Sequence, residues 1–123
     1  MSYVERHVVT ITTDAAGAGT AYTPVVSGRV VSIRYVKTDF ADGVDFTVTS
    51  EATGATIWTE DNVNASKTCV PRQATHDTAG VASLYAAAGE PVEDRIALAN
   101  DRVKIVVATG GATKTGAFHV TMA

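Results

Sequence analysis

Residues Asn100 to Met122 decide the fold, and they read NDRVKIVVATGGATKTGAFHVTM. Two apolar runs in this stretch alternate with polar residues, and the positions on the apolar side are Val103, Ile105, Val107, Phe118, Val120 and Met122. Lys104, His119 and Thr121 fall on the opposite side. A period of two is typical of a half-buried antiparallel strand. The stretch therefore predicts a β-hairpin in the middle of a sheet, closed by a glycine-rich loop.

The remainder of the chain also favours strands over helices. Val and Thr are abundant, whereas Leu84 and Leu98 are the only leucines. β-branched residues lose rotamer freedom in helices and pack well on a pleated sheet. Further strand patterns run over Tyr3–Thr13, Ala21–Thr23, Gly28–Lys37, Val44–Ser50, Thr56–Glu60, Lys67–Arg72 with a break at Pro71, and Val92–Ala99. Val81–Ala87 fits a short strand or one helical turn.

Turn signals separate these runs at regular intervals, among them Asp42-Gly43, Thr53-Gly54 and Asn100-Asp101. We predict an all-β fold, an antiparallel β-sandwich or a jelly-roll-like arrangement of roughly seven to nine short strands with little helix. No repeat or linker divides the sequence, so residues 1–123 are predicted to form a single β domain. Residues 1–7, of mixed polarity, are predicted to be a flexible N-terminal arm that orders on a neighbouring molecule.

Charge and composition exclude several classes of partner. The formal net charge is -3, and the basic residues do not cluster, so we expect no nucleic-acid partner. No apolar run approaches the ~20 residues of a membrane span, so we expect no membrane partner. The single cysteine, Cys69, is interpreted as a small apolar core residue and not as a reactive thiol, in a protein made in a reducing cytoplasm.

The sequence offers few candidates for chemistry. Asp39, Asp42 and Asp45 lie near a glycine but lack the ligand spacing and the terminal glutamate of a calcium-binding loop, which indicates a solvated turn. The three histidines are too scattered to predict a zinc site. The loop at Gly110-Gly111 lacks the helix start of a phosphate-binding loop, because an alternating strand pattern follows it.

A nucleophilic triad is a remote alternative. It would combine His76 and Asp77 with Ser83 or Cys69, but neither nucleophile lies in an activating motif. We therefore predict no enzyme, no catalytic residue, no cofactor and no metal.

Aromatic residues leave one alternative open. Trp58 lies beside Ile57 in a predicted strand, so one of the two side chains should point away from the core. An outward Trp58 would be a subunit contact or part of a sugar-binding platform with a tyrosine. The residues predicted to form a contact surface are Trp58, Tyr35 and Lys114, the last at the tip of the glycine-rich loop.

Three segments resemble small virion structural proteins of tailed bacteriophages. They are YVKTDFADGVDFTVTS from Tyr35 to Ser50, EATGATIW from Glu51 to Trp58, and NDRVKIVVATGGATKTGAFHV from Asn100 to Val120. The resemblance covers about half of the chain and rests on the pattern of strand and turn residues. No functional residue is carried over from it.

The resemblance implies a non-enzymatic head decoration or cement protein. Its partners would be the major capsid protein or another virion protein and further copies of itself, as a homotrimer. It would be assembled in the bacterial cytoplasm and would reside in the virion. The first alternative is a neck, tail or baseplate component of the same particle. The second is a carbohydrate-binding host-attachment module that uses Trp58 and a tyrosine.

Overall fold

The computed structural model describes residues 3–123 and, within that range, consists of eleven β-strands without a helix. The strands are β1 (Glu5–Thr12), β2 (Gly19–Tyr22), β3 (Val26–Val36), β4 (Val44–Ser50), β5 (Thr56–Val63), β6 (Lys67–Cys69), β7 (Arg72–Ala74), β8 (Glu93–Arg95), β9 (Ala97–Asp101), β10 (Val103–Ala108) and β11 (Thr115–Met122). The all-β prediction is confirmed. The count exceeds nine because Val70 and Pro71 separate β6 from β7, and Ile96 separates β8 from β9.

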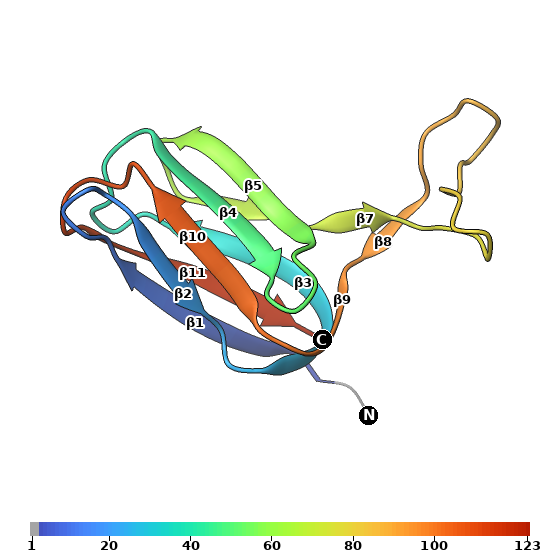
Figure 1. Cartoon of the computed structure of the whole chain (residues 1–123), viewed down its shortest axis with the longest axis horizontal. Helices are drawn as coiled ribbons and strands as arrows, with labels where there is room; N and C mark the ends of the chain where they lie inside the picture. Colours follow the sequence, from blue (N-terminus) through green and yellow to red (C-terminus); the bar gives the residue numbers. More distant parts are fainter. Residues whose placement is uncertain (1–2) are drawn as a thin grey trace.

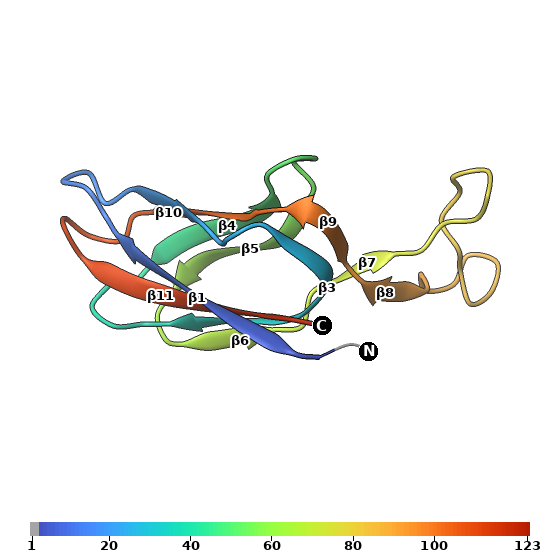
Figure 2. The same ribbon diagram turned by 90° about the horizontal axis from the view of Figure 1, so that it is seen from below.

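Eight strands form two antiparallel sheets, which Figure 2 shows as two layers. The first sheet has the order β1-β11-β3-β6, and the second has the order β2-β10-β4-β5. Strand β9 pairs with the first part of β3, while β7 and β8 pair only with each other. The two layers together make the β-sandwich that the sequence predicts.

The pairing of the eight strands is that of a jelly roll. In chain order the first of them pairs with the last (β1 with β11), the second with the seventh (β2 with β10), the third with the sixth (β3 with β6) and the fourth with the fifth (β4 with β5). This nested pattern is a long antiparallel ribbon rolled into two sheets. Every pair in it is antiparallel, so no crossover helix is needed.

The core lies between the sheets and contains the alternating apolar positions of both. Tyr35, Phe46 and Phe118 are at most 2% exposed, and their ring centroids lie 5.1 to 5.3 Å apart. Trp58 meets Phe46 edge to face at 4.8 Å. Each buried aromatic or branched side chain contributes about 1.5–3 kcal/mol through removal from water. The aromatic cluster therefore joins β3 and β11 of one sheet to β4 and β5 of the other.

The predicted hairpin between the last two strands is wrong, although both strands exist. β10 pairs with β2 and β4, and β11 pairs with β1 and β3, so the two strands lie in different sheets. Each has a single apolar face, and these faces meet across the core instead of lying side by side. The predicted central position is confirmed, because each strand has a neighbour on both edges. The other predicted hairpin, β4 with β5, is present.

Two shorter predictions also differ from the structure. Residues Val81–Ala87 form neither a strand nor a helical turn, but isolated bridges and a turn. Asn100 and Asp101 belong to β9 and not to a turn, and Asn100 has a positive φ of 53° at the end of the strand.

The predicted N-terminal arm overlaps a strand. Glu5, Arg6 and His7 pair with Met122, Thr121 and Val120 in β11, so this part of the segment belongs to the sandwich. Tyr3 and Val4 precede the strand and are exposed, while residues 1–2 lie outside the described residues.

Candidate functional site

A β-arm, which we define as residues 70–95, projects from one end of the sandwich (Figure 1). Its stem is the pair of short strands β7 and β8, in which Arg72 lies opposite Arg95. The stem begins after the buried Pro71 and ends at Ile96, which is 5% exposed. Because the Val30 amide donates to the Ile96 carbonyl at 2.9 Å, the stem continues directly into the sheet.

The arm tip, residues 75–92, folds back on itself through local hydrogen bonds. The Asp77 carboxylate accepts hydrogen bonds from the amides of Ala79 and Val81 at 2.9 and 3.0 Å and closes a first turn. The Tyr85 amide donates to the Glu90 carbonyl at 3.0 Å and frames a second turn. The sequences Asp-x-x-Gly at residues 77–80 and Ala-Gly at residues 88–89 suit such turns because short polar side chains and glycine stabilise them. The tip has no buried apolar core of its own.

Large exposed apolar side chains concentrate at this end of the molecule. In the described chain they are Tyr3, Val4, Val8, Tyr22, Val25, Val70, Val81, Leu84 and Tyr85. Val70, Val81, Leu84 and Tyr85 lie on the arm, whereas Tyr3 and Val4 precede β1, and Tyr22 and Val25 lie at the connection from β2 to β3. β1 starts toward the end of the sandwich from which the arm projects (Figures 1 and 2). We call this region the arm-bearing end. Clustered apolar exposure of this kind marks protein interaction surfaces.

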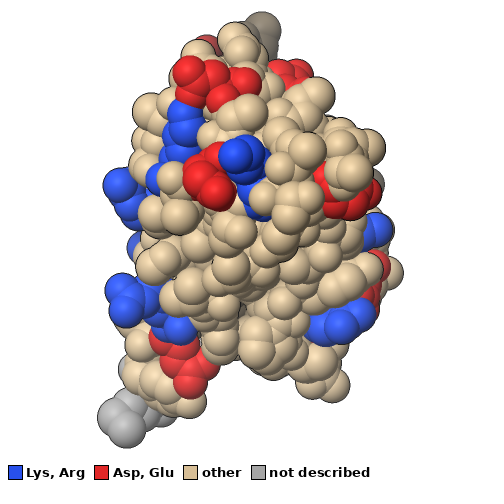
Figure 3. Space-filling view, turned by 90° about the vertical axis from the view of Figure 1, so that its left-hand side faces the viewer, with Lys and Arg blue, Asp and Glu red and all other residues tan. Residues whose placement is uncertain are grey.

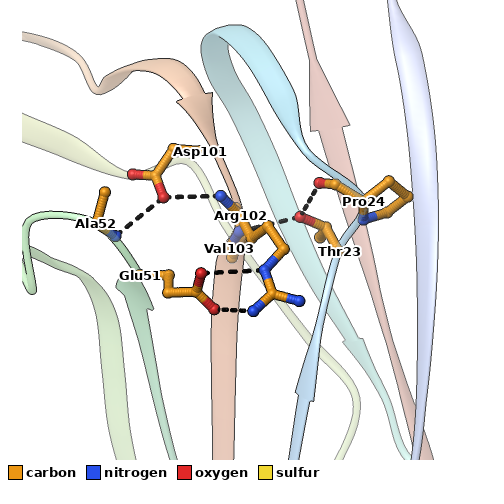
Figure 4. Close-up of polar contacts among 7 residues, drawn as sticks. All are labelled: Thr23, Pro24, Glu51, Ala52, Asp101, Arg102 and Val103. Carbon is orange, nitrogen blue, oxygen red and sulfur yellow. Dashed lines mark hydrogen bonds and ion pairs between the residues drawn. The ribbon is translucent and has the colours of Figure 1, made fainter.

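A polar network fixes the backbone at the arm-bearing end (Figure 4). Asp101 is 6% exposed and accepts hydrogen bonds from the Ser50 hydroxyl and from the amides of Ala52 and Arg102, the last two at 3.0 and 2.7 Å. The Ser50 hydroxyl is the main reason that the pKa of Asp101 is lowered. Asp101 thereby ties the β4–β5 turn to the junction between β9 and β10.

Arg102 extends this network to the surface. Its guanidinium makes a bidentate ion pair with Glu51 and lies 4.1 Å from the centroid of the Tyr22 ring. On the neighbouring strand the Thr23 hydroxyl accepts a hydrogen bond from the Val103 amide at 3.0 Å and donates to the Pro24 carbonyl at 2.9 Å (Figure 4). Tyr22 is thus held against Arg102 at the end of β2, where it is 40% exposed.

The Asp101→Asn variant tests this network through its pH dependence. The folded-state pKa of Asp101 lies below its unfolded value, so its ionised form stabilises the fold above about pH 4 and loses that effect as the pH falls through the lowered pKa. We expect the urea midpoint of the variant to lie below that of the wild type at pH 7, and the difference to shrink below pH 4. A difference that is unchanged down to pH 2 would exclude this role for the Asp101 carboxylate.

The prediction that Tyr35 forms part of a contact surface is wrong. Its side chain is 0% exposed and lies among Phe40, Phe46 and Phe118. Its hydroxyl is buried and has no hydrogen-bond partner, and burial together with the charge of Asp42 raises the pKa of Tyr35 to about 12. β3 places Tyr35 on the inner side with Ile33, as strict alternation requires.

The expectation that either Ile57 or Trp58 points outward is also wrong, and with it the place of Trp58 in a contact surface, because a β-bulge lies between them. Trp58 pairs with Val48, but the next pair joins Thr56 to Thr49, so Ile57 is an extra residue. The bulge turns both side chains inward, at 6% and 7% exposure. The Trp58 indole donates to the Glu60 carboxylate at 3.1 Å. Trp58 therefore offers no exposed ring face for a sugar-binding platform.

Lys114 is exposed, but it lies at the end of the sandwich opposite the arm. We call this the loop end, and it comprises the loops at residues 13–18, 37–43, 64–66 and 109–114. Figure 3 shows this end, where basic and acidic side chains are interspersed among uncharged ones. The loops hold one another: the Thr13 hydroxyl donates to the Gly111 carbonyl at 2.6 Å, and the Gly110 amide donates to the Gly17 carbonyl at 3.0 Å. The three residues of the predicted contact surface are thus not brought together.

The three aspartates of the predicted solvated turn separate at the loop end. Asp42 pairs with Lys37, Asp39 accepts a hydrogen bond from the Thr115 amide, and Asp45 accepts from the Asn62 amide and the Thr109 hydroxyl. Each carboxylate fixes a different contact between segments. Among residues 3–123, no group of three His, Cys, Asp or Glu side chains is placed to hold a metal ion.

Cys69 is half-buried against the core, and burial is the main reason that the pKa of its thiol is raised. It lies on β6, while His76, Asp77 and Ser83 lie in the arm tip.

The β5–β6 connection borders a shallow hollow of about 280 Å³, lined by residues 60–67. Lys67 and Glu60 form an ion pair at 2.9 Å beside it.

Sequence reasoning missed the arm, although signals for it are present. Between Arg72 and Arg95 the chain has four carboxylates and no Lys or Arg, and its bulky apolar side chains, Val81, Leu84, Tyr85 and Val92, do not keep a period of two. A segment of this length that has turn phrasing but no alternating apolar face cannot bury itself in a sandwich. Turn residues without an alternating apolar face therefore indicate a segment that lies outside the core.

Comparison with protein-family models, curated proteins and solved structures finds no match to this chain. Residues 3–123 contain no helix that is long and apolar enough to cross a membrane. The assignment of a function therefore depends on the geometry of the arm-bearing end and on the resemblance in the sequence.

Proposed function

We propose that the chain is a non-enzymatic structural protein of a phage virion, and specifically a decoration or cement protein on the outer surface of the head. The observation that carries the proposal is the concentration of exposed apolar side chains at the arm-bearing end. The jelly roll is compatible with this role because it recurs in viral capsid domains, although lectins and cupins share it. The resemblance of residues 35–58 and 100–120 to small virion proteins of tailed phages supports the same proposal.

The arm-bearing end suits docking on a shell. Tyr3, Val4, Val25 and Val70 are each at least 50% exposed toward this end, and Tyr22 is held against Arg102. A stable protein contact buries on the order of 800 Å² on each partner, and repetition by the symmetry of a capsid multiplies modest single contacts. When the arm-bearing end docks on the shell, the opposite loop end, with Lys114, faces the solvent.

Rebinding to heads tests the proposal. Heads of the source phage that lack this protein are incubated with the purified chain, sedimented, and imaged by negative staining. We expect the chain to co-sediment and to add regular density to the head. Val25→Asp should reduce the bound fraction at least tenfold because it places a charge in the apolar contact, whereas Lys114→Glu at the loop end should bind like the wild type.

A chain that is absent from gradient-purified virions and does not bind heads would overturn the proposal. Sixfold or twelvefold rings at the neck, tail or baseplate would assign the chain to that part of the particle instead. Binding of glycans by the isolated chain, with no binding to heads, would favour host attachment.

A further inference from the structure

We propose that the arm of one copy packs across the outer face of the β1-β11-β3-β6 sheet of a second copy, so that each molecule gives one arm and receives one. The inference rests on the proposed function in one respect, namely that the arm-bearing end is used for docking. It adds the identity of one partner, a second copy of this chain, and the surface that receives the arm.

The arm tip needs a surface on which to bury its apolar side chains. Val81, Leu84 and Tyr85 are 60%, 45% and 77% exposed, although the backbone around them is held by local hydrogen bonds. Fixing the backbone costs about 1–2 kcal/mol per residue, and in the sandwich this cost is offset by burial. The tip has no such burial within its own molecule, because the arm points away from the sandwich (Figures 1 and 2).

The charge of the arm narrows the choice of partner surface. The arm tip includes Asp77 and Glu90 but no Lys or Arg, while the stem carries Glu93 and Asp94 together with Arg72 and Arg95. The tip therefore presents apolar side chains together with negative charge, and a complementary surface carries positive charge and an apolar contact.

The outer face of the β1-β11-β3-β6 sheet carries positive charge and one large exposed apolar side chain, Val8. One row across it joins Val8, His119, Arg34 and Thr68, and Arg6 lies one row away on the same face. Val8 is 54% exposed, and Arg6 and Arg34 are exposed. In the part of these strands that the structure describes, the outward-facing positions include no Asp or Glu.

The two complementary surfaces belong to one chain but lie in different parts of it. Reciprocal exchange between two copies gives a twofold dimer, whereas exchange in one direction around a ring gives a trimer or a larger cyclic assembly. Val8, the one large exposed apolar side chain away from the arm-bearing end, becomes buried in this contact.

Native mass spectrometry of the full chain with charge-reversed variants tests the inference. The wild type should give a multiple of the 12.8 kDa protomer mass. The face variant Arg6→Glu/Arg34→Glu and the arm variant Glu90→Lys/Glu93→Lys should each give the protomer mass, since each brings like charges together. A chain with all four changes should regain the multiple, because it restores opposite charges.

Two further variants keep the result interpretable. Tyr85→Asp should also give the protomer mass, whereas Lys114→Glu at the loop end should keep the multiple. Circular dichroism melts of every variant should remain cooperative, since all of these positions are on the surface. A wild type that stays at 12.8 kDa at 100 µM, or a face variant that keeps the multiple, would overturn the inference.

The outcomes separate the inference from the proposed function. A chain that is monomeric in solution and on heads, yet decorates them, contradicts the arm exchange and leaves the decoration role intact. A chain that forms the arm-dependent multiple but never binds virions contradicts the decoration role and leaves the arm exchange intact.

Discussion

Replacing Phe46 by alanine should lower the free energy of unfolding by about 3–5 kcal/mol, the range for truncating a buried phenylalanine. Phe46 is 2% exposed, and its ring meets Tyr35, Trp58 and Phe118 at centroid distances of 4.8 to 5.2 Å. Its removal leaves a cavity at the point where the two sheets contact each other. Because domains of this size are stable by about 5–15 kcal/mol, much of the total is lost.

Urea denaturation followed by tryptophan fluorescence measures this loss, since Trp58 packs edge to face on Phe46. Val25→Ala is the matched control, because Val25 is 60% exposed before β3 and lies outside the proposed contact between copies, and its truncation should change the unfolding free energy by less than about 0.5 kcal/mol. Equal losses for the two variants would contradict the position of the core.

The Gly116→Ala variant should be destabilised through overpacking. A Cβ at this position would lie 2.9 Å from the Cζ of Phe40 and closer still to its Cδ2 and Cε2. Phe40 is 2% exposed and stacks on Tyr35, so its ring has little freedom to move. An inserted methyl group in such a site costs about 1–3 kcal/mol, which thermal denaturation would detect as a lower midpoint.

A double-mutant cycle assigns this effect to the contact with Phe40. Phe40→Leu removes ring atoms from the space that the new methyl group would enter. The double variant Gly116→Ala/Phe40→Leu should therefore lose less stability than the sum of the two single losses. Additive losses would show that the cost of Gly116→Ala arises elsewhere.

The period of two in the sequence predicted the strands well because it reports which side chains face the core. It identified the inner faces of β10 and β11 correctly, since Val103, Ile105 and Val107 are 0% exposed, as are Phe118 and Val120. Periodicity does not report the partner of a strand. An apolar face is buried equally well beside its neighbour or across a sandwich, and for this reason the predicted hairpin was wrong.

The contact surface could not be predicted because it depends on one inserted residue. The bulge at Ile57 shifts the register of β5 and brings Trp58 inward, whereas strict alternation would leave one of the two outside. Tyr35 was misjudged for a different reason: tyrosine is found both in cores and on surfaces, and its neighbours in the folded chain decide between them. Only Lys114 was correctly expected to be exposed, and it lies opposite the arm.

The most direct test of the docking role is a cryo-electron microscopy reconstruction of the purified virion. We predict a two-sheet density on the head surface whose arm-bearing end contacts the shell, with the arm on a neighbouring copy and Lys114 facing solvent. A particle that lacks this density, or one that holds the protein by its loop end, would contradict the account.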